Sequence, residues 1–372
     1  MSAATRPLRI LHTEASLGWG GQEIRVLTEA RGVARLGHAV LLAAPGESRI
    51  HHEAARYGVR SEALPIGRKR ARGVRALRRL ISTGGFDVVN THSSTDAWLA
   101  ALACVGLPNA PAIVRTRHIS APLARNWATR WLYARASARI VTTGEKLREQ
   151  VLREAGMDAA RVSSIPTGID LTRFHPADRD AARAQLSLSP SASIVGIVAT
   201  LRSWKGHRYL LQALAAMARK DVLLLIVGDG PQRAAIAALV TELGLEARVT
   251  FAGNQEDVSP WMQAMDVFCL PSYANEGVPQ ALMQAMACGL AVVSTPVGSI
   301  EEIVDDGVTG VLVPPEDATQ LRLAVEGLLG DRPRRDALGA RAAARARERF
   351  AEDRMVERMV AVFREASESR HG

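Results

Sequence analysis

The sequence predicts an α/β protein built from two doubly wound, Rossmann-like domains in series. The chain has 372 residues, a length that suits two domains at roughly 150 residues each. In both halves short apolar runs alternate with helical patterns, as in βαβ units that form a parallel sheet with helices on both faces. A hydrophobic content of 47% excludes a disordered chain.

The first domain is expected to span residues 1–186. Its predicted strands are Leu8–His12, Ala39–Ala43, Asp87–Thr91, Ala112–Arg115, Arg139–Thr142 and Val162–Ile165. Its predicted helices are Gln22–Leu36, Asp96–Val105 and Glu145–Ala155.

The second domain is expected to span residues 187–350 after a linker, Thr172–Pro190, in which two prolines bracket a short helical stretch. Its predicted strands are Ile194–Ala199, Val222–Val227, Val249–Phe251, Val267–Leu270, Ala291–Ser294 and Gly310–Val313. Its predicted helices are His207–Ala218, Pro231–Leu243, Pro279–Cys288 and Ala318–Leu329. The segment from Pro333 to Ser369 is predicted to be an Arg- and Ala-rich helix.

Charge separates the two halves. Residues 1–186 hold 28 Lys and Arg against 15 Asp and Glu, a net charge of +13, whereas residues 187–372 hold 19 against 23, a net charge of −4. Three cysteines are too few for a disulfide framework and suit a reducing compartment. No apolar stretch is long enough to span a membrane, and no signal peptide is apparent, so we expect a cytoplasmic protein.

Candidate ligand contacts follow the predicted strands, because open α/β sheets bind ligands at the carboxyl ends of their strands. The first is the Gly18–Glu23 loop, where Gly20 and Gly21 let backbone N–H groups approach a phosphate at a helix N-terminus. Glu23 stands where a dinucleotide fingerprint has its third glycine, which disfavours a NAD site. An ordinary tight turn is the alternative.

Two histidines, His92 and His118, end neighbouring predicted strands, and Arg115 and Arg117 precede the second. Together they predict a polar cleft wall in which histidine donates to a hydroxyl or takes part in acid–base chemistry. A buried structural histidine is the alternative for each. Two histidines lack the third ligand of a metal site, so no metal is predicted.

Two cations, Arg202 and Lys205, lie between a predicted strand and a helix, where they suit a phosphate clamp. Solvated loop charges are the alternative, and the absence of a Walker A pattern excludes a P-loop nucleotidase. Glu276 and Gly277 precede Pro279, which suits the first position of a helix. An acidic helix cap is the alternative for Glu276.

The order of these segments resembles glycosyltransferase family 4, the group 1 glycosyl transferases of the GT-B fold. The matching segments are Leu201–Gly206, Val227–Pro231, Phe251–Gly253, Leu270–Ala285, Ala287–Val293, Pro296–Val304 and Gly307–Pro314. The first half matches more weakly, through Gly20-Gly21, His118 and Thr167–Asp170. The resemblance implies a GT-B fold whose C-terminal helix, residues 351–372, packs back on the first domain. It also implies that a sugar moves from a nucleotide diphosphate donor with retained configuration.

Roles for the donor-site residues follow from the resemblance. The family's pair of acids, separated by seven residues, appears as Glu276, which would hold sugar hydroxyls, and Gln284, which would hydrogen-bond the ribose. Lys205 and Arg202 would stabilise the departing diphosphate in place of a metal ion, so no cofactor is expected. His118 would line the cleft and contact the donor sugar. The other donor-binding residues implied are Gly20, Gly21, Gly228, Gly253, Gly277 and Val278.

The basic first domain is the expected acceptor domain of such an enzyme. Its charge predicts an anionic glycolipid, lipopolysaccharide-core or polysaccharide acceptor, or the inner-membrane surface, to which the protein would attach peripherally. The expected acceptor or membrane residues are His92, Arg72, Arg75, Arg79, Arg115 and Arg117. A stripe of Val74, Leu77 and Ile81 would let the Arg72–Arg79 segment lie in a membrane interface, and a soluble helix packed by that stripe is the alternative. Nucleic acid is not an expected partner, because aromatic residues make up only 4% of the chain.

Two alternatives to a transferase remain. One is a nucleotide-sugar epimerase of the same fold. The other is a non-catalytic sugar-nucleotide-binding protein, which the Gln284 substitution suggests. The sugar, the nucleotide base, the acceptor linkage and the oligomeric state are not predicted by the sequence.

Overall fold

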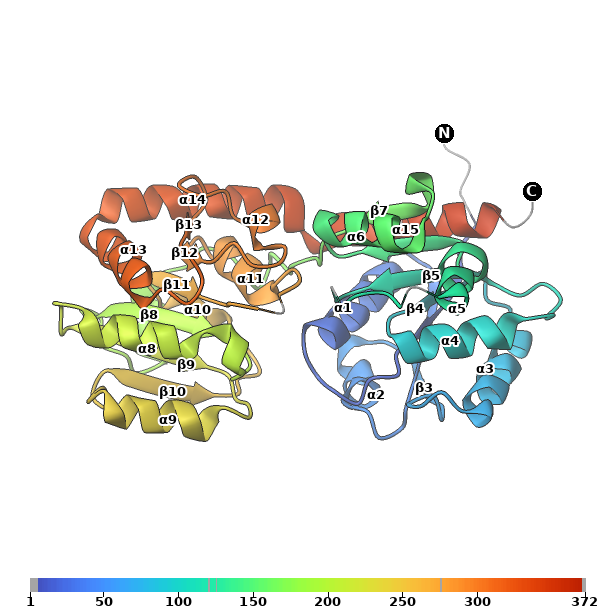
Figure 1. Ribbon diagram of the computed structural model, residues 1–372, viewed down its shortest axis with the longest axis horizontal. Helices are drawn as coiled ribbons and strands as arrows, with labels where there is room; N and C mark the ends of the chain where they lie inside the picture. Colours follow the sequence, from blue (N-terminus) through green and yellow to red (C-terminus); the bar gives the residue numbers. More distant parts are fainter. Residues whose placement is uncertain (1–5, 120, 125, 275, 370–372) are drawn as a thin grey trace. The chain divides into compact units, whose positions relative to one another are not determined.

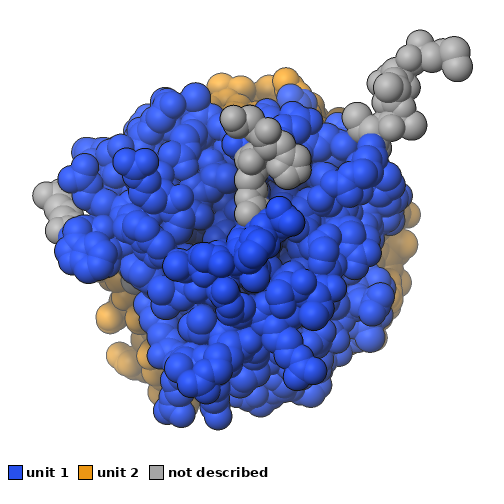
Figure 2. Space-filling model, turned by 90° about the vertical axis from the view of Figure 1, so that its right-hand side faces the viewer, with its two compact units in different colours: residues 1–168, 352–372 blue, residues 169–351 orange. Residues whose placement is uncertain are grey.

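The computed structural model describes residues 6–119, 121–124, 126–274 and 276–369. The chain forms two compact units, residues 1–168 with 352–372 and residues 169–351 (Figure 2). Each unit contains one parallel sheet with helices around it (Figure 1), so the predicted fold class is confirmed.

The first unit has a seven-stranded sheet in the order β3-β2-β1-β4-β5-β6-β7. Its strands are β1 (Arg9–Thr13), β2 (Ala39–Ala44), β3 (Ser61–Ala63), β4 (Val88–Thr91), β5 (Ala112–Arg117), β6 (Arg139–Thr142) and β7 (Val162–Ser164). Its α-helices are α1 (Gly21–Arg35), α2 (Arg49–Glu53), α3 (Ala71–Gly84), α4 (Ser94–Cys104), α5 (Trp127–Trp131), α6 (Glu145–Ala155) and α15 (Glu352–Glu368). Short turns of other helix types complete it: η1 (Ala54–Tyr57), the π-helical η2 (Leu132–Ala136) and η3 (Ala159–Arg161).

Alternating side chains bury both faces of this sheet. Ile10 and Val88 pack against α15, as does Val33 of α1. Leu11 and Val89 point to the opposite face and pack against α3 and α4. Because Leu77 and Ile81 of α3 lie fully inside that second cluster, the apolar stripe is unavailable to a membrane. The expected membrane-interface stripe is therefore wrong, and the alternative of a soluble helix packed by the stripe holds.

The second unit has a six-stranded sheet in the order β10-β9-β8-β11-β12-β13. Its strands are β8 (Ser193–Val198), β9 (Val222–Val227), β10 (Val249–Gly253), β11 (Val267–Leu270), β12 (Ala291–Ser294) and β13 (Val311–Leu312). Its helices are α7 (Arg179–Gln185), η4 (Ser203–Lys205), α8 (His207–Ala216), α9 (Arg233–Glu242), α10 (Ser259–Gln263), α11 (Gln280–Ala287), α12 (Ile300–Ile303), α13 (Ala318–Gly330) and α14 (Arg332–Phe350).

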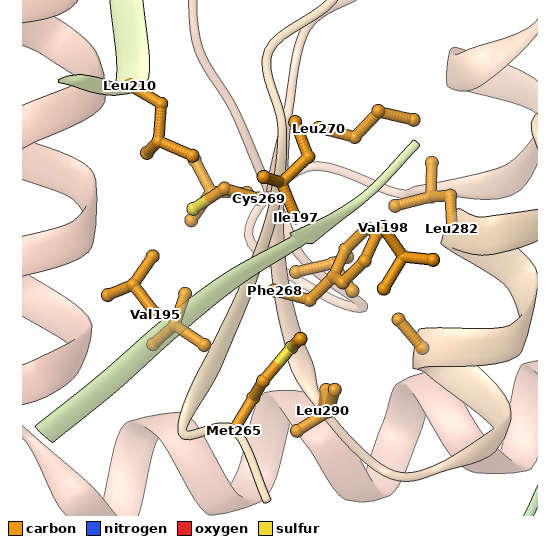
Figure 3. Close-up of a cluster of buried hydrophobic side chains, with 14 of the residues drawn as sticks. Val195, Ile197, Val198, Leu210, Met265, Phe268, Cys269, Leu270, Leu282 and Leu290 are labelled. Carbon is orange, nitrogen blue, oxygen red and sulfur yellow. The ribbon is translucent and has the colours of Figure 1, made fainter. Parts of the chain in front are cut away.

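The central strands of this sheet are apolar on both sides, as parallel sheets covered by helices require. Figure 3 shows Phe268 of β11 near Leu282 of α11, while Cys269 points the other way, toward Leu210 of α8. This core holds the carboxyl ends of β8 and β11 in fixed positions.

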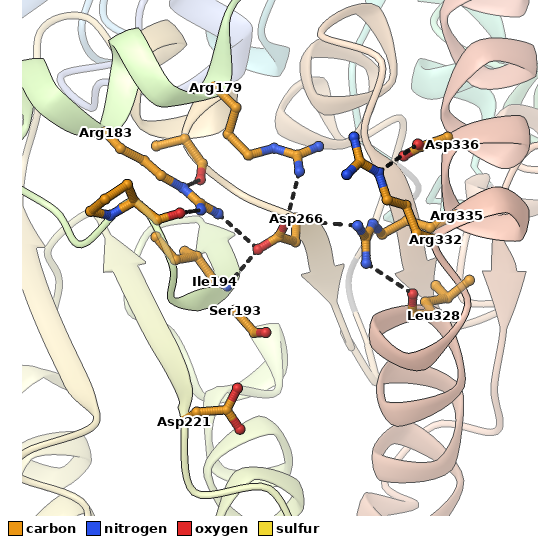
Figure 4. Close-up of polar contacts among 12 residues, drawn as sticks. Arg179, Arg183, Ser193, Ile194, Asp221, Asp266, Leu328, Arg332, Arg335 and Asp336 are labelled. Carbon is orange, nitrogen blue, oxygen red and sulfur yellow. Dashed lines mark hydrogen bonds and ion pairs between the residues drawn. The ribbon is translucent and has the colours of Figure 1, made fainter.

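The boundary between the units lies at residue 168, not at the predicted 186. Asp266, at the start of β11, accepts hydrogen bonds from Arg179 and Arg183 of α7, at 2.8 Å each, and from the Ile194 amide, also at 2.8 Å (Figure 4). Phe174 lies in the core of the second unit. The predicted linker is thus bound to the second unit by paired charges and apolar burial.

The C-terminal segment is two helices where one was predicted. They are separated at Ala351, whose backbone is extended at ψ 137°. The first, α14, packs against α11 and β12, and the second, α15, packs against α1 of the first unit. The Ile169 amide donates to the Phe350 carbonyl at 2.6 Å, so the two points where the chain passes between units are adjacent. Across the described part of the chain, every helix is too short or too polar to traverse a bilayer.

Candidate functional site

In the second unit, the loop after β8 packs against the loop after β11. The Tyr273 amide donates to the Trp204 carbonyl at 2.9 Å. Gly206 has φ +77°, and a Cβ atom there would lie 1.9 Å from the Pro271 carbonyl oxygen. Only glycine permits both this backbone conformation and this close approach. The contact brings Lys205 to the end of β11.

Lys205 and Glu276 form an ion pair at this point. Lys205 Nζ lies 2.6 Å from Glu276 Oε1, and Ser272 Oγ donates to the same oxygen at 2.6 Å. Glu276 is 4% exposed, whereas 19% of the Lys205 side chain is exposed. The ammonium has three N–H groups, so it can bind an anion while it remains paired. A Cβ on Gly298, at φ +62°, would lie 2.0 Å from the Glu276 carbonyl oxygen.

The other predicted donor-site residues of this unit lie nearby in the fold but do not join the ion pair. Arg202 is exposed, with its guanidinium 5.4 Å from the centre of the Trp204 ring. Helix α11 begins at Gln280, with Pro279 as its cap, one residue later than predicted. Gln284 is half-buried on that helix, as are Gly277 and Val278 before it; Asn275 is outside the described residues.

The two remaining predicted glycines, Gly228 and Gly253, are explained by different structural constraints. A Cβ on Gly228 would lie 2.1 Å from the Ala199 carbonyl oxygen, so this glycine is required by strand packing. Gly253 has φ +68°, which favours glycine, and no described atom lies within 4 Å of its would-be Cβ.

In the first unit, three histidines form a line at the carboxyl ends of β1, β4 and β5. His12 Nδ1 lies 3.0 Å from His92 Nε2, and His92 Nδ1 lies 3.1 Å from His118 Nε2. The structure thus brings the two predicted histidines together and adds His12, which sequence reasoning placed inside a strand. Burial lowers the pKa of His12 to about 3 and lowers those of His92 and His118 well below the usual range, so all three rings are neutral.

A buried charge pair lies behind His12. Glu29 Oε1 is 4.0 Å from His12 Nδ1 and accepts a hydrogen bond from Asn90 Nδ2 at 2.9 Å. Glu29 Oε2 lies 3.7 Å from Arg25 Nε, and both side chains are fully buried. Burial raises the pKa of Glu29 to about 7.

His12, Glu29 and His92 offer ligand atoms within 4.8 Å of one another, so the third ligand that the sequence lacked is present in the fold. Arg25 already balances the Glu29 carboxylate, and a divalent ion would place a second positive charge beside it in a buried site. This arrangement disfavours a metal.

One buried carboxyl group near the Gly20-Gly21 loop, that of Glu14, was missed by the sequence analysis. Glu14 follows β1 and accepts hydrogen bonds from the Ser16 amide at 2.8 Å and from Gln22 Nε2 at 2.5 Å. Burial, and then the charge of Asp96, raise the pKa of Glu14 to about 8. Gly20 caps α1 with extended backbone, which any residue adopts, so a turn does not explain this glycine. The predicted strand ended at His12, one residue before the end of β1, so the residue that directly follows the strand was taken to be Thr13 and not Glu14.

The predicted arginines differ in their surroundings. Arg115 and Arg117 are buried against Tyr133: the Arg115 guanidinium lies 4.6 Å from the centre of the ring, and Arg117 Nη1 donates to the hydroxyl at 2.9 Å. They therefore support η2 and are not part of an open surface. The three predicted arginines of α3, Arg72, Arg75 and Arg79, are exposed.

Each of the two units matches a known protein family. Residues 19–173 match the family described as Glycosyltransferase Family 4, and residues 192–331 match Glycosyl transferases group 1. A D-inositol 3-phosphate glycosyltransferase of Nocardia farcinica is 36% identical over 236 residues, which are 60% of this chain and 52% of that protein. Its Mycobacterium bovis counterpart is 31% identical over 320 residues, which are 80% of this chain and 65% of that protein. The chain thus spans between half and two thirds of the length of these curated relatives.

Solved structures share the fold. Anabaena Alr3699/HepE in complex with UDP superposes with a TM-score of 0.82 at 21% identity, over 95% of this chain and 99% of that one. A glycosyltransferase from Rickettsia africae gives a TM-score of 0.85 at 20% identity, over 97% and 98% of the two chains. These likenesses confirm the GT-B fold. The two family matches, over residues 19–173 and 192–331, show that the chain belongs to glycosyltransferase family 4, the group 1 glycosyl transferases.

Proposed function

We propose that this protein is a retaining glycosyltransferase that moves a sugar from a nucleoside diphosphate donor to an anionic acceptor. The observation that supports this most strongly is the Lys205–Glu276 pair at the carboxyl end of the second sheet. Its buried carboxylate and partly exposed ammonium have the chemistry needed to hold sugar hydroxyls and to neutralise a diphosphate.

The donor would bind in the second unit. Cleavage of the bond between sugar and diphosphate puts additional negative charge on the leaving group. Lys205 would stabilise that charge with the N–H groups that Glu276 leaves unused, and the backbone amides at the start of α11 would add the positive end of a helix dipole. Exposed Arg202 would move from Trp204 to the phosphates. No step of this scheme uses a metal ion.

The acceptor would bind in the first unit, whose charge suits an anion. The inositol phosphate named for the relatives is one such acceptor, and the neighbours crystallised with UDP favour a uridine nucleotide. His118 of this unit would contact a ligand oxygen, since its Nδ1 has no hydrogen-bond partner among the described residues.

The test is turnover of UDP-glucose with D-inositol 3-phosphate as acceptor and uncharged inositol as the matched control. The expected result is a glycosylated product whose anomeric configuration, read from the proton coupling constant, equals that of the donor. Reaction only with the uncharged polyol, or an inverted product, would refute this proposal. Sugar isomerisation without transfer would identify an epimerase, and binding without turnover on a wider panel of nucleotide sugars and anionic glycans would identify a binding protein.

The proposal includes attraction to an anionic membrane through the exposed face of α3. Each Lys or Arg near such a surface contributes about 1 kcal/mol at low salt, so three arginines contribute about 3 kcal/mol, or roughly a hundredfold in partitioning. Replacing Arg72, Arg75 and Arg79 with Gln should reduce sedimentation with phosphatidylserine vesicles by up to this amount. The matched control removes equal charge from exposed sites of the second unit, Arg208, Arg334 and Arg347. Equal losses in both variants, or binding indifferent to salt, would show that α3 is only a solvated face.

A further inference from the structure

The two hydrogen bonds that connect the three histidines of the first unit must run in the same direction along the line. A neutral imidazole carries one N–H, on either Nδ1 or Nε2. His12, His92 and His118 are connected by two nitrogen-to-nitrogen contacts of 3.0 and 3.1 Å. Since each contact needs one donor and one acceptor, both hydrogen bonds must run the same way, either outward from His12 or inward from His118.

The surroundings of His12 decide between these directions. His12 Nε2 is buried and has no hydrogen-bond partner among the residues that the structure describes. This nitrogen stays without a partner in either direction, as a donor if the bonds ran inward and as an acceptor if they ran outward, so Glu29 decides. With inward bonds, the Nδ1 lone pair of His12 would face the Glu29 carboxylate, whose Oε1 is 4.0 Å away.

The outward direction removes this repulsion. With its proton on Nδ1, His12 donates to His92 Nε2, and a protonated nitrogen instead of a lone pair lies 4.0 Å from Glu29 Oε1. The position of Glu29 is fixed in turn, because Asn90 donates to its Oε1 and Thr116 Oγ1 donates to the Asn90 side-chain oxygen, each at 2.9 Å.

We propose that His12 and His92 are positioning residues that hold His118 as the Nδ1–H tautomer, so that the first unit presents a hydrogen-bond donor to its ligand. His118 Nε2 is occupied by the His92 proton, and the only ring nitrogen left for a ligand carries a hydrogen. The group it recognises is an oxygen with a free lone pair, in a sugar hydroxyl or a phosphate. In this tautomer His118 cannot take a proton from an acceptor hydroxyl, so it is not a general base. The identity of the ligand rests on the proposed function, whereas the tautomer does not.

The direct test is the protonation state of each ring nitrogen in the ligand-free protein labelled with ¹⁵N-histidine. Long-range ¹H–¹⁵N spectra distinguish protonated from unprotonated ring nitrogens. Signals can be assigned by substituting one histidine at a time, with His52→Gln as a control, because His52 makes no hydrogen bond through its side chain among the described contacts. Protonated Nδ1 and unprotonated Nε2 are expected in all three rings. A protonated Nε2 on His118 would overturn the proposal. Addition of Zn²⁺ gives a second test. If Zn²⁺ removed the proton from His12 Nδ1 and shifted the ¹⁵N signal of His92 Nε2, the site would be a metal centre and the proposal would be overturned.

Two substitutions of His12 separate positioning from packing. His12→Asn retains an N–H donor near the Nδ1 position, whereas His12→Leu removes it. In the Leu variant the His118 tautomers should mix. With half of the molecules in the wrong tautomer, the apparent affinity for the ligand that His118 contacts falls about twofold. The Asn variant should restore both the wild-type spectrum of His118 and the affinity. An unchanged His118 spectrum in the Leu variant would refute the role of His12. If the Leu variant does not fold, the spectrum of the wild-type protein alone decides which tautomer His118 adopts. This result does not depend on whether any variant transfers sugar.

Discussion

Removing the ammonium of Lys205 should destabilise the second unit as well as slow the reaction. In Lys205→Met the Glu276 carboxylate, 4% exposed, loses its partner at 2.6 Å and, among the described contacts, retains the hydrogen bond from the Ser272 hydroxyl. Breaking a buried ion pair from one side costs about 3–5 kcal/mol. Because Lys205 is itself partly exposed and Ser272 still donates, we expect the lower end, about 3 kcal/mol.

Adding Glu276→Gln to Lys205→Met should restore part of the lost stability. Glu276→Gln alone keeps an oxygen that accepts from Lys205 and Ser272, and should cost about 1 kcal/mol. In the double variant no unpaired charge is left, so Lys205→Met/Glu276→Gln should be more stable than Lys205→Met by about 2 kcal/mol. All three variants should lose about 10²–10³ in turnover, the typical cost of one group that stabilises transition-state charge.

Hydrogen exchange at the amides of β8 and β11, measured as a function of urea concentration, gives the free energy of unfolding of the second unit separately from that of the first. Hydrolysis of the nucleotide sugar measures turnover without an acceptor. If the double variant is less stable than Lys205→Met, Glu276 is not an unpaired buried charge and the reasoning fails. Turnover of Lys205→Met within about threefold of wild type would remove Lys205 from the reaction.

Three further predictions concern the loop that packs against Glu276, the buried Glu14 carboxyl and the need for a metal ion. Gly298→Ala should lower nucleotide-sugar affinity by calorimetry, because its Cβ would lie 2.0 Å from the Glu276 carbonyl oxygen; Gly307→Ala, at φ +71° with no described atom within 4 Å, is the matched control, and equal affinities would contradict the prediction. The raised pKa of Glu14, about 8 against an ordinary 4.5, means that the folded protein binds more protons than the unfolded one between these values. Stability therefore falls as pH rises through that window, and Glu14→Gln should flatten the fall in Tm between pH 5 and pH 8, whereas parallel curves would show that Glu14 does not cause it. EDTA should leave turnover intact; loss that a divalent ion restores would show that cationic side chains do not replace a metal.

The sequence was sufficient for the central strands and for both members of the ion pair. Apolar runs such as Val222–Val227 predict strands well, because both faces of a parallel strand are buried. The search for polar residues after the predicted strands identified Lys205 and Glu276. The three-residue β3 was missed because its short, partly exposed segment lacks such a run. That Lys205 pairs with Glu276, 71 residues away, depends on the contact between two loops, which no local pattern encodes.

Other errors arose where one pattern suits two environments. The stripe of α3 looks the same whether Leu77 faces a core or a membrane, and only the position of α4 decides. The predicted boundary at 186 followed the prolines, whereas the arginines of α7 are bound by Asp266, a residue more than 80 positions away. Neither His12 nor Glu29 attracted attention, because each lies within a regular element and gains its meaning from the neighbouring strands.

The adjacent crossing points at Ile169 and Ala351 make the second unit an insertion within the first. A ribosome therefore completes residues 169–351 before it delivers α15, the helix that covers Ile10 and Val88. At 5–20 residues per second, the nascent first unit waits roughly 10–40 s with that apolar face uncovered. The second unit can reach its native state during this interval, and the first cannot. Chains that stop before α15 should expose this face and become substrates for chaperones and proteases.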